Sequence, residues 1–118
     1  MAESINLSVF QGDSLTLNVL YKDSLGSPIN LDGYTAICEI RDSFGGKVSA
    51  AVATIGDGIE VDAELGKITI NFSPDKTFRF IVPKSVWQLQ IIYPDSTTKK
   101  TIAYGVIDVK KAAVTYVG

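Results

Sequence analysis

One stretch of the chain has the residue types and spacing of a nucleophilic motif. Ser73-Pro74-Asp75-Lys76 matches the S-x-x-K pattern, in which a serine nucleophile and a lysine share one helical face. That chemistry also needs a long helix in an α/β setting and further Ser and Lys motifs, which this sequence lacks. Ser73 followed by a proline and an acid is instead typical of a helix start. Because the sequence has no histidine, triads that use one are excluded, and we predict no catalytic residue.

Four carboxylates lie close together in the sequence and raise the question of a metal site. They are Asp57, Glu60, Asp62 and Glu64. A calcium loop needs carboxylates that converge around a tight turn with backbone carbonyls, whereas alternation along a strand directs them outward into solvent. Zinc is disfavoured, because one cysteine and no histidine leave only carboxylates as ligands. We therefore predict neither a metal ion nor any other cofactor.

Two residues that occur once in the chain could belong either to a core or to a site. Cys38 falls on the same strand face as Ile40, which indicates a small buried thiol, and a single cysteine excludes an intrachain disulfide. Trp87 shares its face with Leu89 and Ile91, which favours a place in the core. An exposed Trp87 would instead favour a glycan-binding surface.

The elements that would position these residues are β-strands. Apolar and polar residues alternate with a period of two, which turns one face of each segment toward a core. We predict strands over the ranges 5–9, 14–21, 34–41, 59–61, 67–72, 85–93 and 101–110. The Ala-rich segment 48–55 alternates weakly, so both a strand and a helix are open there. A helix of one or two turns is predicted from Pro74 to Phe80, because Pro83 prevents a long helix.

These elements predict an all-β fold, a single Ig-like antiparallel β-sandwich of about seven strands with one short helical turn. No linker or change of composition divides the chain, so we expect one domain over residues 1–118, and 46% hydrophobic with 20% charged residues is typical of a globular protein. The net charge of −2 disfavours nucleic acid as a partner. No apolar run is long enough to span a bilayer, and no secretory signal is visible, so we expect folding in a cytosol.

Two features of the sequence predict contacts with other proteins. Strand 101–110 is apolar on both faces, and such a strand needs cover from its own chain or from a partner. We predict a contact surface made of Val86, Ile92, Ile102, Tyr104 and Val106. The alternative is that the short helix or the tails cover this face.

The two ends of the chain, residues 1–9 and 111–118, are predicted to be assembly arms. An extended arm can add a strand to the sheet edge of a neighbour, where backbone hydrogen bonds supply affinity. The strand-forming residues of these arms are Ile5, Leu7, Val9, Val114, Tyr116 and Val117. The alternative is that both arms pair within their own sheet.

Several short phrases follow one another in a recognisable order. They are Gln11-Gly12-Asp13-Ser14-Leu15-Thr16-Leu17, Gly26-Ser27-Pro28-Ile29-Asn30-Leu31-Asp32-Gly33-Tyr34-Thr35-Ala36, Ile40-Arg41, Gly66-Lys67-Ile68-Thr69-Ile70, Ser73-Pro74-Asp75, Trp87-Gln88-Leu89-Gln90-Ile91 and Gly105-Val106-Ile107-Asp108-Val109. This order resembles the small β-sandwich module of tailed bacteriophages, found at the N-terminus of baseplate upper proteins and in stand-alone virion proteins. The resemblance runs from about Phe10 to Val109.

The resemblance implies a virion structural protein without enzymatic activity, a tail or baseplate subunit that acts by protein–protein contact. In the baseplate family the module docks onto the tail core and a following stalk carries the receptor-binding parts. Only residues 111–118 follow here, which favours a free-standing subunit. Its implied partners are other virion proteins, with a homo-oligomer in the particle and no nucleic acid, membrane or small-molecule substrate. The protein would be made in the cytoplasm of a bacterial host.

Two other functions stay open beside this one. A capsid decoration or head–tail connector subunit would use the same kind of protein–protein contact at another place in the virion. A host-surface carbohydrate-binding module belongs to a different class, and it requires exposed aromatic side chains or a metal site.

Overall fold

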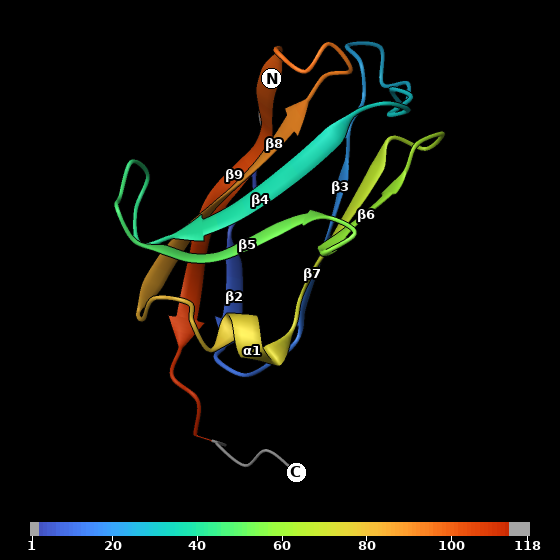
Figure 1. Ribbon diagram of the computed structural model, residues 1–118. Helices are drawn as coiled ribbons and strands as arrows, with labels where there is room; N and C mark the ends of the chain where they lie inside the picture. Colours follow the sequence, from blue (N-terminus) through green and yellow to red (C-terminus); the bar gives the residue numbers. More distant parts are fainter. Residues whose placement is uncertain (1–2, 114–118) are drawn as a thin grey trace.

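The alternating segments of the sequence form β-strands in the computed structural model, which describes residues 3–113 (Figure 1). The strands of this part are β1 (Glu3–Ser4), β2 (Leu7–Phe10), β3 (Leu15–Leu20), β4 (Thr35–Arg41), β5 (Ser49–Ile55), β6 (Gly58–Asp62), β7 (Lys67–Phe72), β8 (Lys84–Ile92) and β9 (Lys99–Lys110), and the helix is α1 (Pro74–Thr77). The all-β class with one short helix is confirmed. Segment 48–55 forms a strand, because Ala51 and Ala53 alternate into the core.

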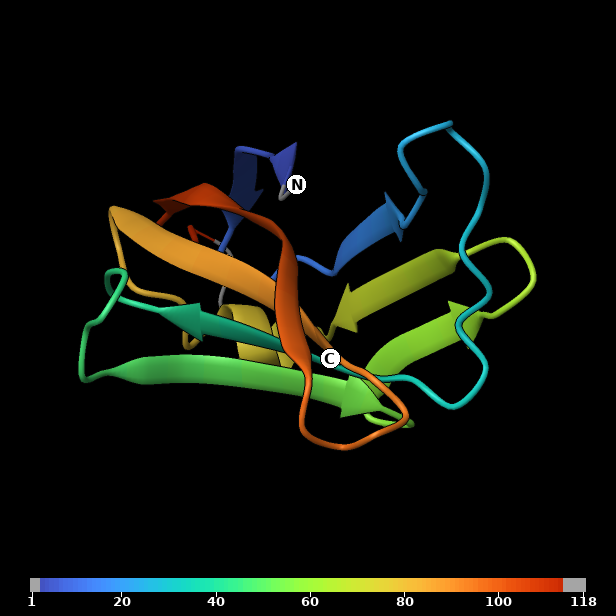
Figure 2. The same ribbon diagram turned by 90° about the horizontal axis from the view of Figure 1, so that it is seen from above.

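The strands join into one mixed sheet in the order β1-β9-β8-β4-β5-β6-β7-β3, and β2 also pairs with β9. The sheet curls into a half-barrel, with β9, β8, β4 and β5 on one side of the core and β6, β7 and β3 on the other (Figure 2). The expected antiparallel two-sheet sandwich is not clearly formed. A short parallel pairing of Thr54–Ile55 with Gly58–Ile59 keeps the hydrogen-bonded ladder continuous from one side to the other.

The core fills the concave side of the half-barrel. Trp87, Leu89 and Ile91 of β8 are each at most 1% exposed, so the prediction that Trp87 belongs to the core is confirmed. Cys38 is also buried, as predicted. Burial raises the pKa of the Cys38 thiol to about 12, because the apolar surroundings disfavour the thiolate.

Helix α1 closes one end of the half-barrel (Figure 1). It ends at Thr77, earlier than the predicted Phe80, and its N-cap residue Ser73 makes no side-chain capping bond. The fully buried Thr77 hydroxyl instead accepts a hydrogen bond from the backbone N–H of Gly12 (3.0 Å) and lies 2.9 Å from the carbonyl of Asp13. The helix therefore holds the turn between β2 and β3 in place.

The N-terminal segment pairs with β9 of its own chain, parallel to it, through both β1 and β2. Ile5 and Leu7 pack against the core, and Val9 is buried. The prediction that residues 1–9 form an arm outside the body is therefore wrong for residues 3–9, because strand β9 offers them a free edge within the same chain. The C-terminal arm residues Val114, Tyr116 and Val117 lie outside the described residues.

Candidate contact surface

The convex face of β4, β8 and β9 carries the predicted contact surface. Along β8, buried residues alternate with outward ones, and the same alternation runs along β4 and the second half of β9. Val86 lies opposite Val106 in the β8–β9 pairing, and Gln88 lies opposite Tyr104. Cross-strand neighbours on one face are in contact, so these four side chains form one continuous area.

An aromatic side chain that the sequence analysis did not select completes this area. Phe44 stands in the loop between β4 and β5, and its ring lies edge-on to the ring of Tyr104 with 6.1 Å between the centroids. Phe44 is 53% exposed and Tyr104 is 37% exposed. Arg41 holds the loop by donating a hydrogen bond from Nη1 to the carbonyl of Gly46 (2.8 Å). We call Phe44, Val86, Tyr104 and Val106 the aromatic patch.

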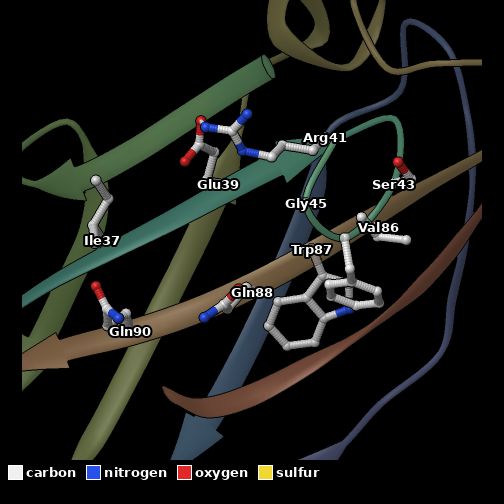
Figure 3. A pocket seen from close by; sticks show the side chains of 10 residues that line it. Ile37, Glu39, Arg41, Ser43, Gly45, Val86, Trp87, Gln88 and Gln90 are labelled. Carbon is white, nitrogen blue, oxygen red and sulfur yellow. Dashed lines mark ion pairs between the residues drawn. The ribbon is translucent and has the colours of Figure 1, made fainter. Parts of the chain in front are cut away.

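A shallow pocket of about 240 Å³ lies beside the aromatic patch. Residues of β4, of β8 and of the loop between β4 and β5 line it, and Figure 3 shows all but one of them with labels. They are Ile37, Glu39, Arg41, Ser43, Phe44, Gly45, Val86, Trp87, Gln88 and Gln90. Glu39 and Arg41 form an ion pair of 2.9 Å at its rim, where both side chains are about one-third exposed. The pocket thus combines an apolar wall with amide and charged groups.

The five predicted contact residues do not all share this face. Val86, Tyr104 and Val106 lie together, and Ile92 is at the far end of β8, opposite Lys99. Ile102 is only 4% exposed and lines a hollow on the concave side with Tyr21. The reason is a β-bulge: the register shifts at Leu89/Gln90, so that β9 has one extra residue there and its alternation changes phase.

The sequence around Phe44 holds one weak signal of its role. The loop Asp42-Ser43-Phe44-Gly45 has turn residues at every position except that of Phe44. This signal is not specific, because Leu25 holds the same position in the turn Asp23-Ser24-Leu25-Gly26 and is 89% exposed. The outward residues Glu39, Arg41 and Gln88 were also missed, because nothing in their local sequence distinguishes them from other solvated strand positions.

The motifs tested for chemistry lie away from this surface. Ser73 is exposed, and Lys76 Nζ donates to the carbonyl of Val52 (3.1 Å) and lies 3.4 Å from a carboxylate oxygen of Asp57. Glu60, Asp62 and Glu64 are exposed. Within residues 3–113, no three His, Cys, Asp or Glu side chains are grouped as metal ligands would be.

No helix between residues 3 and 113 has the length and apolar character needed to cross a membrane. No protein-family model matches the sequence, and neither does any curated protein.

Proposed function

We propose that the protein is a structural subunit of a bacteriophage virion, placed in the tail or baseplate, which acts by protein–protein contact through the aromatic patch. The order of sequence phrases that resembles the baseplate module supports the class of protein. The observation that carries the mode of action is the edge-on pair of Phe44 and Tyr104, exposed on a sheet face beside Val86 and Val106. Exposed apolar residues that adjoin one another mark interaction sites, and aromatic residues are frequent anchors in them.

The backbone supports this use of the patch. The patch residues Val86, Tyr104 and Val106 stand on the long strands β8 and β9. Strand β8 is paired with β4 and β9, and β9 is paired with β8 and, over half of its residues, with β1 and β2. Side chains on such strands are already ordered before a partner arrives, so binding costs little conformational entropy. Partners in the proposal are other virion proteins, including further copies of this chain.

The proposal also concerns the fold. The two sides of the half-barrel, β9-β8-β4-β5 and β6-β7-β3, would correspond to the two layers of the module's Ig-like sandwich. In that comparison the short pairing of β5 with β6 is the feature that links the two layers.

Particles purified from a bacterial host that expresses the gene from its native locus test the function. We expect mass spectrometry to find the protein at a fixed copy number per particle, and labelled antibody in electron micrographs to mark the tail or baseplate. Label on the head or the neck would favour the capsid decoration or head–tail connector alternative. Absence of the protein from intact particles would contradict a virion role altogether.

A second candidate function, glycan recognition at a host surface, is favoured by the pocket beside the patch. A sugar presents an apolar C–H face and hydroxyl groups, and the pocket offers the ring of Phe44 beside the amides of Gln88 and Gln90. Titration of the purified protein with host cell-wall glycans, with and without calcium, tests it. Saturable binding that Gln90→Ala abolishes would support glycan recognition over the structural role.

A further inference from the structure

We propose that strand β3 is an acceptor edge that takes up residues 111–118 of a second copy of this chain as an added strand. The inference rests on the proposed function, since it supplies the contact by which copies would assemble. It concerns a different surface from the aromatic patch, on the opposite side of the half-barrel.

Strand β3 is the end of the sheet, because it pairs with β7 on one side and with no strand of the described residues on the other. The N–H of Tyr21 donates to the carbonyl of Gly66 (2.7 Å), which gives the direction of the hydrogen bonds between the two strands. Because this direction alternates along an antiparallel strand, the N–H and C=O groups of Thr16, Asn18 and Leu20 point away from β7. These outward groups form a row of hydrogen-bond donors and acceptors with which an added strand could pair.

The β3 edge has none of the features that protect sheet edges. Its six residues, Leu-Thr-Leu-Asn-Val-Leu, include no charge, proline or bulge. Strand β5 pairs with β6 only at Thr54 and Ile55, so the rest of β5 also has a free side. That side is covered, because Lys76 donates to the carbonyl of Val52 and α1 packs beside β5. The opposite end of the sheet is divided into the short strands β1 and β2. Only β3 combines length with an unprotected edge in residues 3–113.

The space next to β3 is open at one end. Strands β2 and β3 diverge from the turn at residues 11–14 (Figure 2). This turn is held closed by Gln11 Nε2, which donates to the carbonyl of Phe80 in the segment after α1 (3.2 Å). At the other end lies a hollow of about 640 Å³ between Glu3 of β1 and Leu20 of β3, with Ile102 in its wall. A strand that pairs with β3 therefore enters from the side of this hollow.

Residues 111–118 have a composition that suits an added strand at the β3 edge. Ala112, Val114 and Tyr116 alternate with Ala113, Thr115 and Val117, and no charge follows Lys111. Strand-forming residues with this alternation present one apolar row to the half-buried Leu15 and Leu17. With eight residues, the segment is long enough to pair with all six residues of β3.

A second copy, rather than the same chain, is the donor because of where β9 ends. Lys110 accepts a hydrogen bond from the N–H of Gln11 (2.8 Å), so the chain leaves β9 beside the closed turn and away from the hollow. Its own residues 111–118 therefore start at the wrong end of the space beside β3.

Analytical ultracentrifugation of the full chain, with three variants, tests the inference. Asn18→Pro removes an outward N–H, and Asn18→Ala is the matched control, because both lose the bond that Asn18 accepts from Thr69. We expect the wild type and Asn18→Ala to self-associate, and Asn18→Pro to raise the dissociation constant at least about tenfold. Tyr116→Asp, in the donor segment, should have the same effect. Leu20→Lys replaces Asn18→Pro if the proline prevents folding.

Mixing the variants gives the sharpest result. Asn18→Pro retains an intact donor segment and Tyr116→Asp retains an intact acceptor edge. The two should therefore form a one-to-one dimer together, although each alone self-associates at least about tenfold more weakly than the wild type. A wild type that stays monomeric at all concentrations would overturn the inference, as would a mixture that fails to dimerise. A monomeric protein that is nevertheless found in purified particles would overturn this inference while the virion role stands.

Discussion

The indole Nε1 of Trp87 donates a hydrogen bond to the backbone carbonyl of Ile5 over 3.0 Å. Ile5 stands between β1 and β2, where the N-terminal segment crosses β9 closely. The buried side chain of Trp87 thus links the core to the N-terminal segment, whose strands β1 and β2 pair with the outer edge of β9. The bond also uses the only polar atom of the indole ring, which would otherwise be buried without a partner.

We expect Trp87→Ala to lower the free energy of unfolding by about 3–5 kcal/mol, through loss of core packing. Trp87→Phe keeps much of the volume but removes the bond to Ile5, and should cost about 1–3 kcal/mol. Chemical denaturation measures both. A loss below about 1 kcal/mol for the alanine variant would mean that the side chain is not a core residue.

Gly105 makes the same crossing possible, because a β-carbon there would collide with the carbonyl of Ile5. We expect Gly105→Ala to displace residues 3–6 from β9 and to destabilise the protein by about 1–3 kcal/mol. Hydrogen exchange should then show lost protection at the N–H of Ile5, which donates to the carbonyl of Tyr104 (2.8 Å). Gly45→Ala is the control: its site is open, so it should cost only about 1 kcal/mol for the left-handed backbone and leave Ile5 protected.

Tyr104→Asp and Ile102→Asp should behave in opposite ways, although only two positions separate them. Tyr104 is partly exposed, so its variant should stay folded while assembly into particles weakens by about 2 kcal/mol or more, since a charge would be buried at the contact. Ile102 is buried, so its variant should fail to fold. Circular dichroism and particle incorporation measure the two effects.

Thr54→Asp on the exposed part of β5 is the control for the aromatic patch, because it adds the same charge at the other edge of the convex face. It should fold and assemble normally. If Tyr104→Asp assembles as well as this control, the patch is not a contact surface.

Cys38 should resist alkylation in the folded protein. Its pKa rises from an ordinary 9.0 to about 12 through burial, which lowers the thiolate fraction at neutral pH about a thousandfold. Iodoacetamide should label the thiol rapidly in guanidinium chloride and only at the rate of unfolding in buffer. Rapid labelling of the native protein would show that the core around Cys38 opens without global unfolding.

Asp95 should titrate at an unusually acid pH. The Thr98 hydroxyl donates to its carboxylate (2.6 Å), as do the N–H groups of Thr98 and Thr97 (2.8 Å each), and these bonds lower the pKa from 3.8 to about 2. Because the folded-state pKa is the lower one, the stabilisation is present above about pH 4 and is lost as the pH falls toward 2. Carboxyl resonances followed by NMR measure this pKa. Thr98→Val should move it back toward 3.8, and an unchanged value would contradict the assigned cause.

The sequence by itself determined where the strands lie and which way their side chains face. The expected segments 67–72, 85–93 and 101–110 correspond to β7, β8 and β9 within about two residues, and Trp87 and Cys38 are buried as their neighbours indicated. A period of two is a property of one strand, so it can be read without knowing which strand lies beside it. Turn residues mark the ends of these segments in the same local way.

Only the tertiary structure decided how the strands pair, and therefore which outward residues form a surface. The parallel pairing of β1 and β2 with β9 joins strands that are about 100 residues apart in the sequence, and no local pattern specifies such a partner. The bulge opposite Leu89 and Gln90 turned Ile102 inward, because Ile102 is the extra residue there and breaks the alternation that residues 103–109 follow. Phe44, in the loop after β4, reached Tyr104 of β9, although β8 lies between these two strands in the sheet. Each of these results depends on contacts between residues far apart in sequence, which alternation within a segment cannot encode.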